Sequence, residues 1–175
     1  MRRLLLFRHA HAERAESGQS DLDRVLTAEG KHDAAIMGAY IGRHGFQPDR
    51  VVVSPAARTR ETWDAVAAAL HPAPSAIFNE RIYDAIAQAL LIALKDTPDS
   101  AQTLLVIGHN PGLHDLALML VATGDINTRE RLGEKFPTAG LAILDFALDA
   151  WAKLHARAAR LERFVSPKSI ARATN

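Results

Sequence analysis

Four short runs of aliphatic and β-branched residues constrain the fold of this chain more than any other feature of its sequence. They cover residues 4–7, 51–53, 104–107 and 141–146, and each ends abruptly in a polar or glycine-containing segment. Runs of this length and composition are typical of strands that are buried on both faces of a sheet. The chain becomes basic from Trp151, and a further strand is expected around residues 159–165.

The segments between these runs carry apolar residues at helical spacing. Helix starts are expected at Thr27, at Ser54 with Pro55 in the first turn, and at Asp84. An i, i+3, i+4, i+7, i+8 stripe predicts a fourth helix over residues 113–121. Such alternation of strands and helices indicates an α/β fold, in which a mostly parallel sheet has helices on both faces.

The length of 175 residues and a hydrophobic content of 48% fit one compact domain spanning residues 1–175. The polar stretch of residues 124–137 is expected to be a surface loop. A formal charge of +1 gives no overall field that would attract nucleic acid or an anionic membrane. The chain has no cysteine, so disulfides and thiolate chemistry are excluded. The first apolar run is too short for a membrane span or signal peptide, and we expect a cytoplasmic protein.

Unusual polar residues follow three of the four apolar runs directly. The segments are Arg8-His9-Ala10-His11, Ser54-Pro55-Ala56-Ala57-Arg58 and Gly108-His109-Asn110-Pro111-Gly112. Because ligands bind beyond the carboxyl ends of strands in open parallel sheets, we expect these side chains to meet in one crevice. Two guanidinium groups in one crevice would repel each other without an anion between them, and their geometry suits a phosphate or a carboxylate. The crevice is therefore predicted to bind an oxyanion.

Within this crevice, His9 is the candidate nucleophile. A neutral imidazole can attack phosphorus and form a phosphoramidate, which splits hydrolysis into two steps. Arg8, Arg58 and His109 would bind the phosphoryl oxygens and stabilise the charge that they carry in the transition state. This arrangement needs no metal ion and no other cofactor.

Three alternatives use the same residues differently. His9, His11 and His109 could hold zinc, although two arginines aimed at the same crevice oppose a cation there. Ser54 could be a nucleophile, but no glycine-flanked elbow surrounds it, and a helix N-cap explains it adequately. A binding module without turnover could read phosphate, but it would not need His9.

The motifs and their order resemble those of the histidine phosphatase superfamily, which includes phosphoglycerate mutases and acid phosphatases. The matching residues are the Arg8-His9 pair, Arg58 between Ser54 and Thr62, His109 in Gly-His-Asn-Pro, and Leu26-Thr27 with Gly30. The resemblance implies a phosphoglycerate mutase-like fold. It also implies for Arg8, His9, Arg58 and His109 the roles given above.

Within the superfamily the chain is most similar to the SixA-type phosphohistidine phosphatases. The similarity lies in the short length, in Arg-His-Ala, in Phe136-Pro137-Thr138-Ala139, and in the ending of residues 163–168. It implies a phosphohistidine on a partner protein as substrate, for example on a histidine-containing phosphotransfer domain. A small phosphate ester is the alternative, and a mutase is disfavoured because the chain is short. The sequence does not predict an oligomeric state.

The residue that would donate a proton to the leaving group is open. The segment of residues 79–83 resembles the one that carries the proton-donating glutamate of the mutases, so Glu80 is the first candidate and Asp84 the second. A salt bridge or a helix cap is the structural alternative for Glu80. An imidazole leaving group needs less help from an acid than an alkoxide does.

Overall fold

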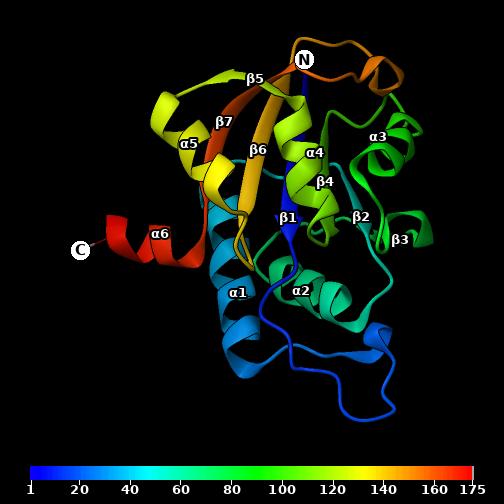
Figure 1. The fold of residues 1–175 in the computed structure, drawn as a ribbon. Coiled ribbons are helices and arrows are strands. Elements are labelled where there is room, and N and C mark those ends of the chain that lie inside the picture. Colours follow the sequence, from blue (N-terminus) through cyan, green and yellow to red (C-terminus); the bar gives the residue numbers. More distant parts are fainter. Residues whose placement is uncertain (175) are drawn as a thin grey trace.

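The computed structural model describes residues 1–174, which form a seven-stranded sheet with helices on both faces (Figure 1). The strands are β1 (Arg2–Arg8), β2 (Arg50–Val53), β3 (Ala76–Phe78), β4 (Thr103–Gly108), β5 (Val121–Gly124), β6 (Leu141–Phe146) and β7 (Ala159–Val165). The α-helices are α1 (Ala28–Arg43), α2 (Ala57–Ala67), α3 (Ala87–Lys95), α4 (Gly112–Leu120), α5 (Ile126–Glu134) and α6 (Pro167–Ala173). Short 3-10 helices are η1 (Asp21–Asp23), η2 (Glu80–Ile82) and η3 (Trp151–Lys153).

The strand order is β3-β2-β4-β1-β6-β7-β5, so β1 lies at the centre of the sheet. Four pairings are parallel, namely β1 with β4, β4 with β2, β2 with β3, and β5 with β7. β6 runs antiparallel to both of its neighbours, β1 and β7. The expectation of an α/β fold with a mostly parallel sheet is confirmed among the described residues.

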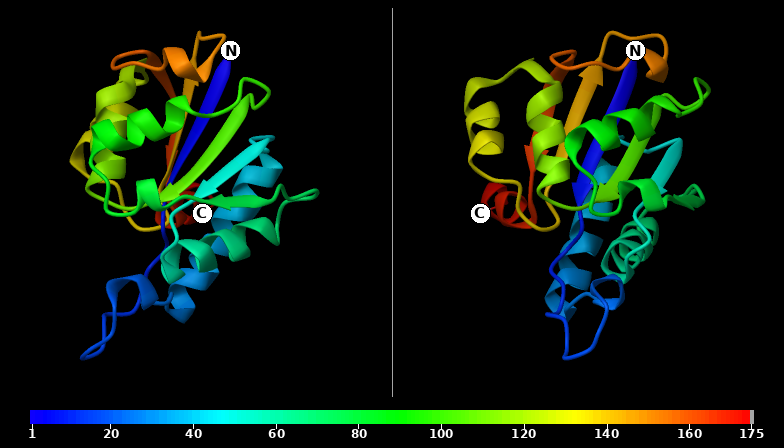
Figure 2. Two further views of the ribbon diagram at one scale, coloured as in Figure 1. Left: turned by 90° about the vertical axis from the view of Figure 1, so that its right-hand side faces the viewer. Right: turned by 45° about the vertical axis from the view of Figure 1, so that its right-hand side comes forward.

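Side chains of β1 alternate between two buried layers, as strand geometry requires. Leu4 and Leu6 pack into a cluster with α3 and α4, and Leu132 of α5 joins the same cluster. Leu5 and Phe7 pack on the opposite face against α1 and α2. Figure 2 shows these two helical layers on either side of the sheet. Each of these four β1 side chains is fully buried, and each contributes ~1.5–3 kcal/mol to the hydrophobic stabilisation.

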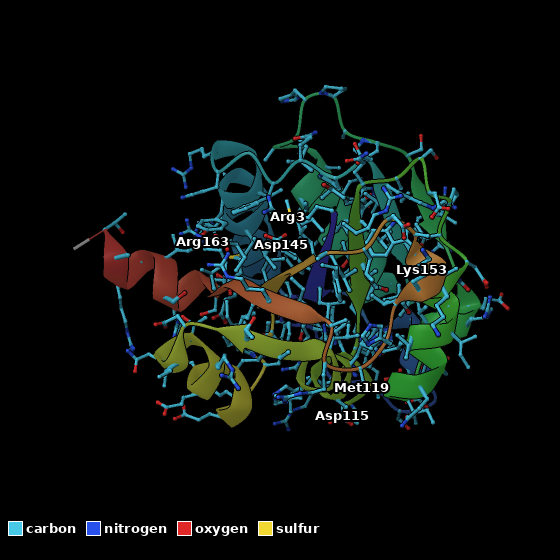
Figure 3. All side chains as sticks on the ribbon, turned by 90° about the horizontal axis from the view of Figure 1, so that it is seen from above. Arg3, Asp115, Met119, Asp145, Lys153 and Arg163 are labelled. Atoms are coloured by element: carbon cyan, nitrogen blue, oxygen red, sulfur yellow. The ribbon has the colours of Figure 1, made fainter. Side chains whose placement is uncertain are left out.

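An ion pair joins the central strand to its antiparallel neighbour. Arg3 and Asp145 are directly opposite each other in the register of β1 and β6. Arg3 Nε and Nη2 each donate a 2.7 Å hydrogen bond to one carboxylate oxygen of Asp145. Figure 3, which views the molecule from above, shows the two labelled side chains side by side. This bidentate geometry is the strong form of an arginine–carboxylate pair, and it links β1 and β6 in the observed register.

The structure corrects two of the expected helix starts. Thr27 caps α1 as expected, since its side chain accepts a hydrogen bond from the backbone N–H of Gly30. Ser54 does not cap α2, because it still follows β2, donating its backbone N–H to the Ile107 carbonyl, and α2 begins three residues later without a side-chain cap. Asp84 does not open α3 either. It has a φ of +49°, and α3 begins at Ala87.

The prediction of a loop over residues 124–137 is wrong. These residues contain helix α5, whose N-cap Asp125 accepts from the backbone N–H of Thr128. The helix buries Leu132 alone, so it lacks the apolar stripe by which a helix is identified in a sequence. The helix expected over residues 113–121 ends at Leu120, because Val121 begins β5.

Across residues 1–174 the helices are all too short or too polar to cross a membrane.

Candidate active site

The three polar segments found in the sequence lie side by side at the carboxyl ends of β1, β4 and β2. The backbone N–H of His9 donates to the Gly108 carbonyl at 3.1 Å, and that of Ser54 donates to the Ile107 carbonyl at 3.1 Å. These strands are parallel, so their ends converge on one edge of the sheet next to α2 (Figure 2). A cleft of about 380 Å³ opens there, lined by Asp21, Arg58, Tyr83, Asp84, His109 and Asn110.

The imidazole of His9 lies on the floor of this region, with 9% of the residue exposed. Its Nδ1 is 2.7 Å from the carbonyl oxygen of Ala10. A carbonyl can only accept, so Nδ1 carries the hydrogen and Nε2 keeps its lone pair. Burial lowers the pKa of His9 to about 4, and the charges of Arg58 and Arg8 act in the same direction. His9 is therefore neutral at neutral pH, with Nε2 available as a nucleophile.

The second histidine faces the first, and their ring centroids are 5.3 Å apart. Arg58 Nη2 lies 3.2 Å from His109 Nδ1, and Ser54 Oγ lies 2.6 Å from His109 Nε2. Because a guanidinium can only donate, Nδ1 is the acceptor and Nε2–H donates to Ser54. Burial lowers the pKa of His109 to about 3, and the charge of Arg58, together with that of His9 once His9 is protonated in acid, acts in the same direction. His109 thus holds the guanidinium of Arg58 in place beside His9.

Arg58 lines the cleft, and Arg8 ends β1 next to His9. Arg58 is 5% exposed and gives hydrogen bonds from Nη1 to the carbonyl oxygen of Asp21 at 2.7 Å and from Nη2 to the Asp21 carboxylate at 3.0 Å. Arg8 is half-buried, which lowers the pKa of its guanidinium, and its Nη1 donates to the Phe136 carbonyl at 2.9 Å. In the described part of the chain, Nε of each arginine is buried without a hydrogen-bond partner. Unpaired buried donors of this kind are costly unless an acceptor binds them, which fits an oxyanion site.

Two further side chains that line the cleft, Asp21 and Tyr83, were given no role from the sequence, whereas Asn110 belongs to a polar segment expected there. The Tyr83 hydroxyl donates to Asp21 Oδ2 at 2.5 Å, and its ring meets the His109 ring edge-on, with centroids 5.4 Å apart. The Tyr83 hydroxyl, together with Arg24 and Arg58, holds the pKa of Asp21 far below its usual range despite partial burial. Asp21 lies in an exposed polar segment without periodicity, so no sequence pattern could have identified it.

The two candidate proton donors lie in different places. Asp84 is exposed and lines the cleft itself. Glu80 is exposed on η2 and lines a neighbouring groove of about 560 Å³, which shares Tyr83 with the cleft.

The zinc alternative requires three histidines to converge. His9 and His109 face each other, but His11 Nδ1 lies 3.0 Å from Thr27 Oγ1 at the start of α1. Over residues 1–174, His, Cys, Asp and Glu side chains nowhere gather in groups of three or more that could hold a metal ion. Ser54 is fully buried and bonded to His109, which makes it a support for that histidine rather than an exposed nucleophile.

Comparison with known proteins agrees with this geometry. The sequence profile of the histidine phosphatase superfamily (branch 1) matches residues 4–86. The chain is 30% identical to a solved structure assigned as the phosphohistidine phosphatase SixA from Nakamurella multipartitia, with a TM-score of 0.80 over 95% of this chain and 96% of the other. The chain belongs to the histidine phosphatase superfamily, and within it to the SixA type.

Two further proteins are similar to this chain over most of their length. A SixA-assigned structure from Agrobacterium tumefaciens is 28% identical, with a TM-score of 0.80 over 95% of this chain and 98% of the other. An uncharacterised protein of Mycobacterium tuberculosis is 34% identical over 90% of this chain and 99% of its own length. As a histidine phosphatase with the phosphoglycerate mutase-like fold, the chain is a hydrolase that acts on phosphoryl groups.

Proposed function

We propose that this phosphatase removes the phosphoryl group from a phosphohistidine on a partner protein, through a phosphorylated His9 and without a metal ion. The observation that carries the proposal is the neutral His9, whose Nε2 is unprotonated beside a histidine and two arginines with spare N–H donors. Similarity to SixA-assigned structures supports the substrate class. A small phosphate ester is the second candidate, and the cytoplasmic location expected from the sequence stays a prediction.

In the first step, His9 Nε2 attacks phosphorus as the bond from phosphorus to the leaving nitrogen breaks. The leaving nitrogen keeps the bonding pair and takes one proton from water or from an acid at the cleft, so the partner histidine departs as neutral imidazole. Arg8 and Arg58 bind the phosphoryl oxygens and stabilise their charge in the loose transition state. In the second step, water attacks phosphorus, the bond to Nε2 breaks, and inorganic phosphate leaves with neutral His9 restored.

His109 changes partners during this cycle. A bound phosphoryl dianion raises the pKa of a neighbouring imidazole, which favours protonation of His109 at Nδ1. Nδ1–H and Arg58 Nη2 are then both donors, so their 3.2 Å contact cannot persist. We infer that Nδ1–H turns to a phosphoryl oxygen while Nε2–H keeps its bond to Ser54 Oγ. His109 then becomes the third ligand of the phosphoryl group.

A rapid-quench experiment tests the nucleophile. Incubation with a ³²P-labelled phosphohistidine protein should label the enzyme with an acid-labile, alkali-stable phosphate on His9, and His9→Ala should abolish label and turnover. The matched control is His11→Ala, two residues along the chain and bonded to Thr27, which should keep both. Undiminished label in His9→Ala would refute the proposal. Activity that EDTA removes and zinc restores would favour the metal alternative.

Two comparisons refine the proposal. The ratio of kcat/KM for the phosphohistidine protein to that for p-nitrophenyl phosphate separates the two substrate classes. Glu80→Gln and Asp84→Asn separate the two candidate proton donors, since loss of the true donor should slow ester hydrolysis more than phosphohistidine hydrolysis.

A further inference from the structure

Positively and negatively charged side chains lie at different depths in the cleft. The Arg58 guanidinium lies on its floor, with a side chain only 6% exposed, beside the buried and neutral His9. The carboxylates lie on its rim, where the Asp21 side chain is 50% exposed and Asp84 is also exposed. A phosphoryl group bound by the floor would therefore extend its leaving group past two carboxylates.

Of the two rim carboxylates, Asp21 is fixed most firmly. Its Oδ2 accepts hydrogen bonds from Arg58 Nη2 at 3.0 Å and from the Tyr83 hydroxyl at 2.5 Å. Its Oδ1 accepts another from Arg24 at 3.0 Å. These donors favour the ionised carboxylate, so Asp21 keeps a full negative charge at neutral pH and cannot serve as the proton donor.

The same hydrogen bonds place that charge close to the chemistry. Arg58 Nη2 contacts both Asp21 Oδ2 and His109 Nδ1. No more than two hydrogen-bond lengths therefore separate the carboxylate from the histidine that faces His9. At such a separation, in a partly desolvated cleft, a fixed charge interacts measurably with any charge on the leaving group.

We propose that Asp21 determines specificity by charge: it favours phosphorylated ligands with a positive charge on the leaving group and disfavours those with a negative one. This inference adds a substrate preference to the proposed function. It depends on that function only in requiring that the cleft binds a phosphoryl group. A phosphohistidine whose other ring nitrogen is protonated carries a positive charge on its leaving group, and Asp21 stabilises that charge. Phosphate esters that also carry a carboxylate are repelled by the negative charge of Asp21, and Asp84 adds to this repulsion. The site therefore selects against such ligands through an unfavourable contact.

Benzylphosphonates test this inference because they bind a phosphate site without turnover. Three of them, with a para aminomethyl, methyl or carboxymethyl group, differ chiefly in the charge at the rim. Calorimetry on the wild type should give a Kd for the aminomethyl compound about tenfold lower than for the carboxymethyl compound, once solvent screening is included. Asp21→Asn should remove most of this difference.

The choice of asparagine separates charge from positioning. Its side-chain oxygen can still accept from Tyr83 and Arg58, so the variant removes the charge while it keeps the support of Arg58. Asp23→Asn is the matched control, because Asp23 lies in the same η1 turn but lines the neighbouring groove. This control should keep the wild-type ratio of Kd values.

Equal binding of the three compounds by the wild type, or an unchanged ratio in Asp21→Asn, would overturn the inference, as would failure of all three to bind. If Asp21→Asn does not fold, a salt titration of the wild type provides the test. The ratio of the Kd values of the carboxymethyl and aminomethyl compounds should fall towards one as salt rises from about 20 mM to about 500 mM. A ratio that does not change with salt contradicts the proposal. Failure of the proposed function is a separate result, because it shows as the absence of phosphorylated His9 while the binding ratio persists.

Discussion

Acid should destabilise this protein through His9. Its folded-state pKa is about 4, against an ordinary value of 6.5, chiefly because the imidazole is buried. The folded-state pKa is lowered, so the unfolded chain takes up the proton first as the pH falls. The stabilisation is complete above about pH 6.5 and is lost progressively as the pH falls towards 4. His109, with a pKa of about 3, loses its contribution over the same range and further down.

The magnitude follows from the two pKa values. At ~1.4 kcal/mol per pKa unit, the difference between 6.5 and about 4 corresponds to roughly 3 kcal/mol of unfolding free energy. No large discount for solvent screening applies, since His9 is only 9% exposed. His9→Gln removes the titrating group, and the glutamine amide can still donate to the Ala10 carbonyl.

Urea unfolding followed by circular dichroism, between about pH 7 and pH 4.5, measures this effect. The wild type should lose roughly 2–3 kcal/mol more over this range than His9→Gln does. His155→Gln replaces an exposed histidine and should follow the wild type. Parallel loss of stability in the wild type and in His9→Gln would refute the reasoning, because burial of a neutral imidazole would then carry no free energy.

Two further substitutions test the supports of the site. Gly112→Ala would place a Cβ 1.9 Å from the backbone oxygen of Ala85, next to the cleft loop, and should lower stability by about 1–3 kcal/mol in a thermal melt. Gly133→Ala, which meets nothing within 4 Å in α5, should instead stabilise by about 0.5–1 kcal/mol. Ser54→Ala removes the acceptor of the His109 Nε2–H and should cost about 1–3 kcal/mol in urea unfolding. A Ser54→Ala variant as stable as the wild type would contradict that hydrogen bond.

Much of the sheet could be predicted because strands that are buried on both faces consist almost entirely of apolar residues. Residues 104–107, for example, are buried on both faces and carry no polar side chain. The short edge strand β3 was not predicted, because two of its residues, Ile77 and Phe78, are exposed and its sequence lacks the pattern of a buried strand. Helix α5 escaped prediction for the related reason that it contributes one side chain, Leu132, to the core.

The site divides in the same way. The convergence of Arg8, His9, Arg58 and His109 could be predicted because each follows a predicted strand at a fixed place, and the structure brings them together, while their roles stay predictions. Ser54 was assigned to the wrong partner, because a serine before a proline has the local pattern of a helix cap, whereas its hydroxyl contacts a residue 55 positions away. Long-range contacts of this kind have no local pattern.

Because β1 lies at the centre of the sheet, its pairing must wait for strands that are synthesised much later. β1 is synthesised before both of its partners, since it pairs with β4 and with β6, whose residues follow about 100 and about 140 positions later. Until then its apolar run has two open edges, the state in which strands associate with other chains. Pairings this distant in sequence also slow folding. The strand that delivers the nucleophile is therefore the one that the growing chain must protect for longest.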